Sequence, residues 1–108
     1  MTEERPLLDT VMEMTAASMS NSNLGARELM LVRLAALAAV DAPPASYLLN
    51  LAAAVDAGLT LEDAQGVLIA VAPIIGTPRT VSATGSIAKA LGFALDVAEA
   101  IEEGQAQA

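Results

Sequence analysis

Proline and glycine residues divide this sequence into segments of helical length, and apolar residues recur within the segments at three- and four-residue steps. That spacing places the apolar side chains on one face of an α-helix. No segment shows the two-residue alternation typical of a β-strand. Alanine, the best helix former, makes up about a fifth of the chain, and aromatic residues only 2%. We therefore expect an all-α fold of five or six closely packed helices.

The same residues predict where the helices begin and end. The sequence Thr60-Leu61-Glu62-Asp63 is typical of an N-terminal capping box, with Asp in place of the usual Glu. Thr77 is expected to cap the last helix, with Pro78 at its first position. The expected helices are one from Pro6 to a loop at 20–23, one over about 25–40, one from Pro44 to Gly58, one from Thr60 to a stop or kink near Pro73, and one over 79–103 with a break at Gly92.

A chain of 108 residues fits one domain, so we treat residues 1–108 as a single helical domain. The helix over about 25–40 is apolar on nearly all sides and is expected to be the central element. One small bundle cannot cover both this helix and the fourth one. We therefore expect burial between subunits, which predicts a homo-oligomer.

Charge and the missing residue types exclude several classes of function. The net charge is −8 and the five basic residues are scattered, which argues against nucleic-acid binding and against docking on an anionic membrane. The absence of cysteine excludes disulfides and thiolate chemistry, and the absence of histidine removes the commonest general base and metal ligand. The sequence has no metal-ligand spacing and no phosphate-binding glycine loop. We expect neither a metal nor a cofactor.

The sequence also lacks signals for export or membrane insertion. The acidic N-terminus has no apolar core of a signal peptide. The longest apolar run without a charge, residues 64–76, is too short to span a bilayer. We expect a cytoplasmic protein with no membrane partner.

Three stretches have the order and spacing found in one protein family. They are Arg27-Glu28-Leu29 followed by residues 31–35, residues 54–60 followed by Glu62-Asp63, and residues 72–78 followed by Ala83. Together these stretches resemble the carboxymuconolactone decarboxylase family, whose fold is also called alkyl hydroperoxidase D-like. The resemblance implies an all-helical bundle that assembles into trimers or hexamers, with active sites near the subunit contacts.

The sequence departs from this family at the residues that carry redox chemistry. Redox members have a Cys-x-x-Cys pair and a histidine, and the histidine lies eight positions before the glycine that ends the helix. Counted back from Gly58, these three positions hold Pro43, Ser46 and Asn50. Without a thiolate there is neither a peroxidatic nucleophile nor a resolving disulfide, so peroxidase activity by this route is excluded. Asn50 does not titrate near neutral pH, which also argues against a decarboxylase that uses histidine as its proton donor.

Glu28 and Arg79 are the charged candidates for a site. Glu28 lies in the most apolar helix, where a raised pKa would make it a general acid or base. The alternative for Glu28 is a carboxylate at the helix edge or at a subunit contact. Arg79, with Thr77, Thr80 and the free amides of a helix N-terminus, would bind a small-molecule carboxylate. The alternative for Arg79 is a solvated or paired arginine.

Ser46, Tyr47 and Asn50 are the uncharged candidates for substrate binding. Tyr47 and Asn50 are three residues apart, and Ser46 and Asn50 are four apart, so each pair shares a face of one helix. If the family's pocket is retained, these side chains line it and offer hydrogen bonds. The alternative is a polar helix face in water.

Two functions follow from these residues. The first is a carboxymuconolactone decarboxylase-like protein without thiol redox activity, acting on a small organic acid as a non-redox lyase, decarboxylase or isomerase. Arg79 would hold the substrate carboxylate and Glu28 would move a proton, while Tyr47 and Asn50 would orient the substrate. The second is a non-catalytic oligomeric binding or assembly module, in which Ala-rich faces pack subunits together. A helical protein unrelated to the family would instead be a monomer without the shared pocket.

Overall fold

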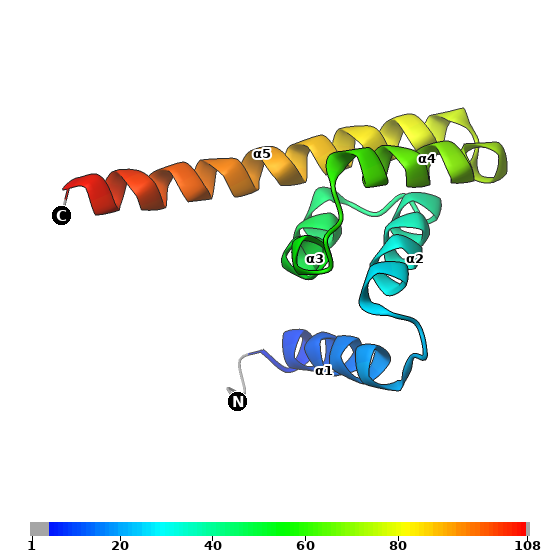
Figure 1. Cartoon of the computed structure of the whole chain (residues 1–108), viewed down its shortest axis with the longest axis horizontal. Coiled ribbons are helices and arrows are strands. Elements are labelled where there is room, and N and C mark those ends of the chain that lie inside the picture. Colours follow the sequence, from blue (N-terminus) through cyan, green and yellow to red (C-terminus); the bar gives the residue numbers. More distant parts are fainter. Residues whose placement is uncertain (1–4, 108) are drawn as a thin grey trace.

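The chain folds into five α-helices (Figure 1). The structure, a computed structural model, describes residues 5–107. The helices are α1 (Pro6–Asn21), α2 (Ala26–Ala39), α3 (Pro44–Asp56), α4 (Leu61–Ile75) and α5 (Thr77–Gln107). No strand occurs within residues 5–107, which confirms the expected all-α class.

Most helix ends follow the local signals of the sequence. α1 and α3 each begin with a proline in the first turn, where no amide hydrogen is needed. At the start of α4, the Thr60 hydroxyl accepts from the Asp63 amide and the Asp63 carboxylate accepts from the Thr60 amide. The predicted capping box is therefore confirmed. Gly58, whose φ of +84° favours glycine, follows α3 as the expected stop.

Two predicted boundaries were wrong. α5 runs without interruption through Gly92, because one glycine in a helix costs only about 1 kcal/mol and strong helix formers flank it. The turn before α5 is closed by Gly76 and not by Thr77: the Gly76 carbonyl accepts from the Thr80 amide at 3.1 Å. The φ of Gly76 is +90°, a conformation that side chains disfavour.

α2 is the central helix of the bundle. It packs against α3, α4 and α5, as its apolar sequence predicted. Besides Leu29 and Met30, the buried residues form two small clusters, Ala38 with Leu68 and Ala83, and Ala42 with Tyr47 and Ala90. Because most residues of the two clusters are alanine, the helices approach closely but the core has little volume. Val32 of α2 and Val40, the residue that follows α2, are exposed, so this helix is not covered on all sides.

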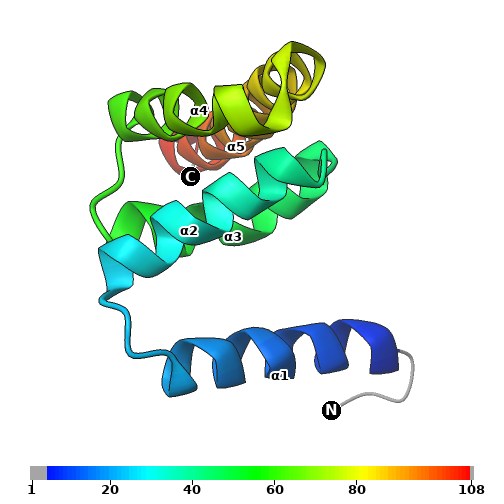
Figure 2. The same cartoon turned by 90° about the vertical axis from the view of Figure 1, so that its right-hand side faces the viewer.

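α1 and the C-terminal half of α5 lie outside the bundle. In both views α1 lies apart from the other helices (Figures 1 and 2), and none of its residues is buried. Arg33 of α2 ties α1 to the bundle, since its Nη2 donates to the Ser18 hydroxyl at 3.0 Å and to the Thr15 carbonyl at 3.4 Å. The chain measures 50 × 31 × 26 Å, and its radius of gyration is 15.6 Å. A compact chain of this length would have a radius of gyration of roughly 13 Å.

Candidate functional site

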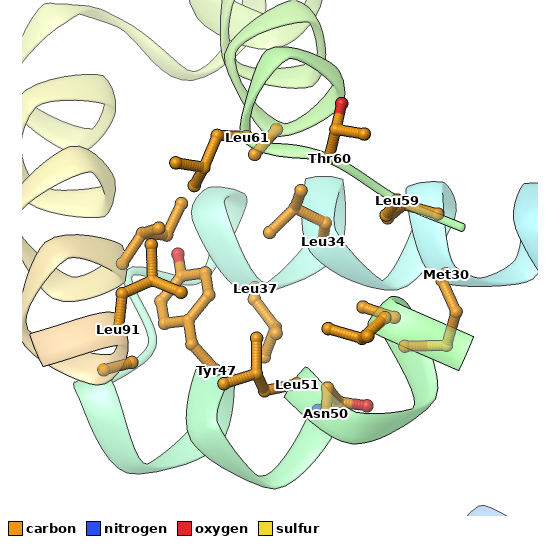
Figure 3. A pocket seen from close by; sticks show the side chains of 15 residues that line it. Met30, Leu34, Leu37, Tyr47, Asn50, Leu51, Leu59, Thr60, Leu61 and Leu91 are labelled. Atoms are coloured by element: carbon orange, nitrogen blue, oxygen red, sulfur yellow. The ribbon is translucent and has the colours of Figure 1, made fainter. Parts of the chain in front are cut away.

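An apolar pocket of about 200 Å³ lies where α2, α3 and α5 meet the N-terminus of α4 (Figure 3). Aliphatic side chains from all four helices form most of its wall. The polar lining residues are Tyr47, Asn50 and Thr60. The pocket therefore combines a largely hydrophobic wall with a few groups that can form hydrogen bonds.

The pocket runs from the core of the bundle to its surface. Met30, Tyr47 and Ala90 are buried and form its inner part. Val55 and Leu61 also line it, yet they are 62% and 67% exposed. The pocket thus opens to solvent between the end of α3 and the start of α4.

The Tyr47 hydroxyl is the unusual group in this pocket. Tyr47 is only 6% exposed, and its hydroxyl has no hydrogen-bond partner in the described part of the chain. Figure 3 shows the ring beside the pocket with its oxygen among aliphatic side chains. Burial raises the pKa of Tyr47, and the nearby negative charge of Asp41 raises this pKa further. The phenol is therefore a neutral hydrogen-bond donor at physiological pH.

The other two polar lining residues have partners within the chain. The Asn50 amide nitrogen donates to the Ser46 carbonyl at 2.9 Å, one helical turn earlier. The Thr60 hydroxyl is shared with Asp63 in the capping box. Tyr47 is thus the lining side chain whose polar atom is buried without a hydrogen-bond partner among residues 5–107.

The structure divides the residues proposed as a site. It brings Tyr47 and Asn50 together in the pocket. Ser46 does not line the pocket, and its carbonyl accepts a hydrogen bond from Asn50. Glu28 does not line the pocket: it is exposed in the first turn of α2, where its carboxylate lies against Gly25. An acidic side chain at a helix N-terminus interacts favourably with the helix dipole.

Arg79 and Thr80 also lie outside the pocket. The Arg79 Nη1 donates to the Ala39 carbonyl at 3.1 Å, so the guanidinium caps the C-terminus of α2. The Thr80 hydroxyl donates to the Gly76 carbonyl at 2.9 Å, one turn earlier in the chain. The Arg79 contact links α2 to the start of α5, whereas the Thr80 bond is local to that start.

A salt bridge that the sequence did not predict secures one wall of the pocket. Both terminal nitrogens of Arg27 contact the Asp63 carboxylate, Nη2 to Oδ1 at 2.7 Å and Nη1 to Oδ2 at 3.1 Å. Hydrogen bonds from Arg27, followed by the one from the Thr60 amide, hold the pKa of Asp63 well below its usual range. The start of α4, which carries Leu61 into the pocket wall, is thereby fixed to α2. The capping box was visible in the sequence, but a partner 36 residues away was not.

Residues 5–89 match the family model described as Carboxymuconolactone decarboxylase family. The chain belongs to this family. The match covers more than half of the sequence, and the all-helical bundle agrees with it. No curated protein and no solved structure matches the chain.

In this member of the carboxymuconolactone decarboxylase family, the positions expected to hold the redox residues are Pro43, Ser46 and Asn50. These residues cap α3 or form hydrogen bonds within it. Pro43 is the N-cap residue of α3, and its carbonyl accepts from the Ser46 amide at 3.0 Å. Asn50, at the histidine position, returns its amide to the same helix turn. The chain contains no cysteine or histidine, so the thiol chemistry of the redox members is absent. The described part of the chain also holds no cluster of three or more metal-binding side chains.

Proposed function

We propose that this member of the carboxymuconolactone decarboxylase family is a non-catalytic, homo-oligomeric binding module. The observation that carries the proposal is the large surface of the isolated chain. Its accessible surface is 7487 Å², whereas a compact chain of 10.9 kDa exposes roughly 5,600 Å². The difference of about 1,900 Å² exceeds the roughly 800 Å² that each partner contributes to a stable interface.

Exposed large apolar residues occur on the two elements outside the bundle as well as on the bundle itself. In α1, the exposed large apolar residues are Leu7, Leu8, Val11, Met12, Met14 and Met19. In α5, Phe93, Val97 and Ile101 follow one another at four-residue steps, all of them exposed. Apolar patches of this extent on a soluble chain are typical of interaction sites.

A second copy of the chain is the occupant we assign to these faces. The apolar stripe of α5 is accompanied on the other side of the helix by Asp96, Glu99 and Glu103, an arrangement that suits a helix packed on protein along one face. Within residues 5–107, the stretch Thr77–Gly104 is also long and apolar enough to cross a membrane by length and composition. Its acidic stripe supports the protein partner. Family resemblance supports a trimer or hexamer.

A non-redox lyase, decarboxylase or isomerase acting on a small organic acid is the second candidate. It is favoured by Tyr47 and Asn50 lining one pocket. The proposed proton carrier Glu28 and the proposed carboxylate anchor Arg79 both lie outside that pocket, which favours the binding module. In an enzyme of this kind Glu28→Gln would abolish turnover, whereas in the binding module it would affect only assembly or melting temperature.

Sedimentation velocity on matched α5 variants tests the assembly. We expect the wild-type chain to sediment as a multimer and Ile101→Glu to shift it to the 10.9 kDa monomer, because a charge would be buried in the interface. Leu95→Glu is the matched control: it adds the same charge to the same helix, at a position 63% exposed and one turn from Glu99 on the acidic side. This control variant should assemble as the wild type does. A wild-type monomer, or equal dissociation by both variants, would contradict the proposal.

A further inference from the structure

We infer that the Tyr47 pocket binds a small, uncharged and largely apolar molecule that offers one hydrogen-bond acceptor to the Tyr47 hydroxyl. The inference rests on the proposed function in treating the chain as a binding module, and it specifies the class of ligand. It is supported by the size of the pocket, by the chemistry of its wall and by the unpartnered phenol.

The pocket has the volume of a small ring compound. Its size is about 200 Å³. An apolar cavity of about 150 Å³ in another protein is sufficient to hold benzene. A six-membered ring with one polar substituent therefore fits, whereas a ligand of ordinary drug size, which takes a pocket of roughly 300 Å³ or more, does not.

The wall selects against a charged ligand. The lining residues include leucine, isoleucine, valine, alanine and methionine side chains, and none of them is Asp, Glu, Lys or Arg. Arg79, which the sequence suggested as the partner of a carboxylate, lies outside the pocket and donates a hydrogen bond to the Ala39 carbonyl at the end of α2. An organic acid would thus lose the hydration of its carboxylate without gaining a counter-charge, which is strongly unfavourable.

The phenol selects for an acceptor. A buried hydroxyl without a partner is unfavourable, so an acceptor that reaches it gains a hydrogen bond the free protein lacks. Tyr47 is 6% exposed and lies beside the buried Ala42 and Ala90, which hold its ring in place. The donor is therefore fixed in position before the ligand arrives, and this preorganisation favours binding.

The test compares three probes of one ring size on the full chain, using ligand-observed NMR titration. Cyclohexanone carries one neutral acceptor, cyclohexane carries none, and cyclohexanecarboxylate carries a charge. Tyr47→Phe is the matched variant, since it removes only the hydroxyl. We expect cyclohexanone to bind the wild type about threefold to tenfold more tightly than Tyr47→Phe. Cyclohexane should bind both proteins equally, and the carboxylate should bind the wild type about tenfold or more weakly than cyclohexanone.

A spectroscopic readout reports on the hydrogen bond itself. Tyr47 is the only tyrosine and the chain has no tryptophan, so its near-ultraviolet absorbance comes from this phenol apart from the weak bands of Phe93. Cyclohexanone should shift that absorbance to longer wavelength, and cyclohexane should not. The inference is overturned if cyclohexanone does not bind, if its affinity is unchanged in Tyr47→Phe, or if the carboxylate binds as tightly as the ketone.

The two proposals fail separately. A monomer that binds cyclohexanone through Tyr47 would contradict the assembly and leave the ligand class standing. A multimer that does not bind cyclohexanone would contradict the ligand class and leave the assembly standing.

Discussion

At the scale of single residues, the pocket is defined by one phenol and by the side chains that are absent around it. Tyr47 supplies a neutral hydrogen-bond donor, and the lining residues include no carboxylate, imidazole, amine or thiol. Such a set can hold and orient a molecule but has no proton donor that titrates near neutral pH. This set of side chains supports the proposed binding role.

Part of this site could be predicted because it is local in sequence. Tyr47 and Asn50 lie three residues apart on one helix, a spacing that predicted a shared face, and in the structure both line the pocket, whereas Ser46 does not. Arg79 and Arg27 could not be placed, because their partners Ala39 and Asp63 are 40 and 36 residues away. A charge pattern does not reveal which of thirteen acids or many carbonyls an arginine will meet.

The salt bridge at Asp63 makes a prediction about pH. The pKa of Asp63 is lower in the folded chain than its usual value of about 3.9 in an unfolded one. The stability from its ionised form is therefore present above about pH 3.9 and is lost as the pH falls further, through the lowered pKa. We expect Asp63→Asn to melt at a lower temperature than the wild type near neutral pH, because it removes the charge that Arg27 and Thr60 contact.

Thermal melting followed by circular dichroism checks this at several pH values. The difference in melting temperature between wild type and Asp63→Asn should shrink as the pH is lowered through about 3.9 toward about 2. In that range Asp63 takes up a proton in the unfolded wild-type chain, whereas its carboxylate stays ionised in the folded one, so protonation favours unfolding. Comparing the two chains cancels the titration of the other acids. A difference that stays constant over this range would show that the charge of Asp63 does not stabilise the fold.

At the scale of helices, the boundaries that depend on short sequence motifs were predictable, whereas the glycine at position 92 wrongly predicted a break. The capping box at Thr60 and the proline starts of α1 and α3 depend on neighbours within one turn. The expected break at Gly92 depended on a residue that disfavours a helix only slightly, and the long run of helix formers around it prevailed.

Substitution of Gly92 and of Gly76 by alanine should change the stability of the chain in opposite directions. Gly92 is helical and a methyl group there would meet no atom within 4 Å, so Gly92→Ala should stabilise the chain by about 0.5–1 kcal/mol. Gly76 has a φ of +90° and a ψ of 162°, a region nearly restricted to glycine. Gly76→Ala should therefore destabilise the chain by about 1–3 kcal/mol.

Urea denaturation of both variants measures these changes, with the slope of the transition checked against the wild type. A destabilising Gly92→Ala would mean that α5 is not a continuous, freely accessible helix at that point. An unchanged stability of Gly76→Ala would contradict the left-handed turn between α4 and α5.

At the scale of the whole molecule, the chain is too extended to be stabilised, as a compact monomer is, by the burial of one core. Half of its buried residues are alanines, and among the residues whose burial the structure describes no large side chain is fully buried. α1 is tied to the bundle by Arg33, and α5 projects beyond it (Figure 1). The sequence predicted that the second and fourth helices would need a partner, whereas the faces assigned here lie on α1 and the end of α5. The positions of α1 and the end of α5 depend on contacts distant in sequence, which the sequence pattern does not reveal. We expect those faces to be covered by further copies of the chain.

Native mass spectrometry of the purified chain, across the micromolar range, tests this expectation most directly. The exposed faces of α1 and α5 predict an assembly of several 10.9 kDa chains, with a trimer or hexamer as the expected species. A chain that is a 10.9 kDa monomer at every concentration, while circular dichroism shows it fully helical, would contradict the binding module proposed here.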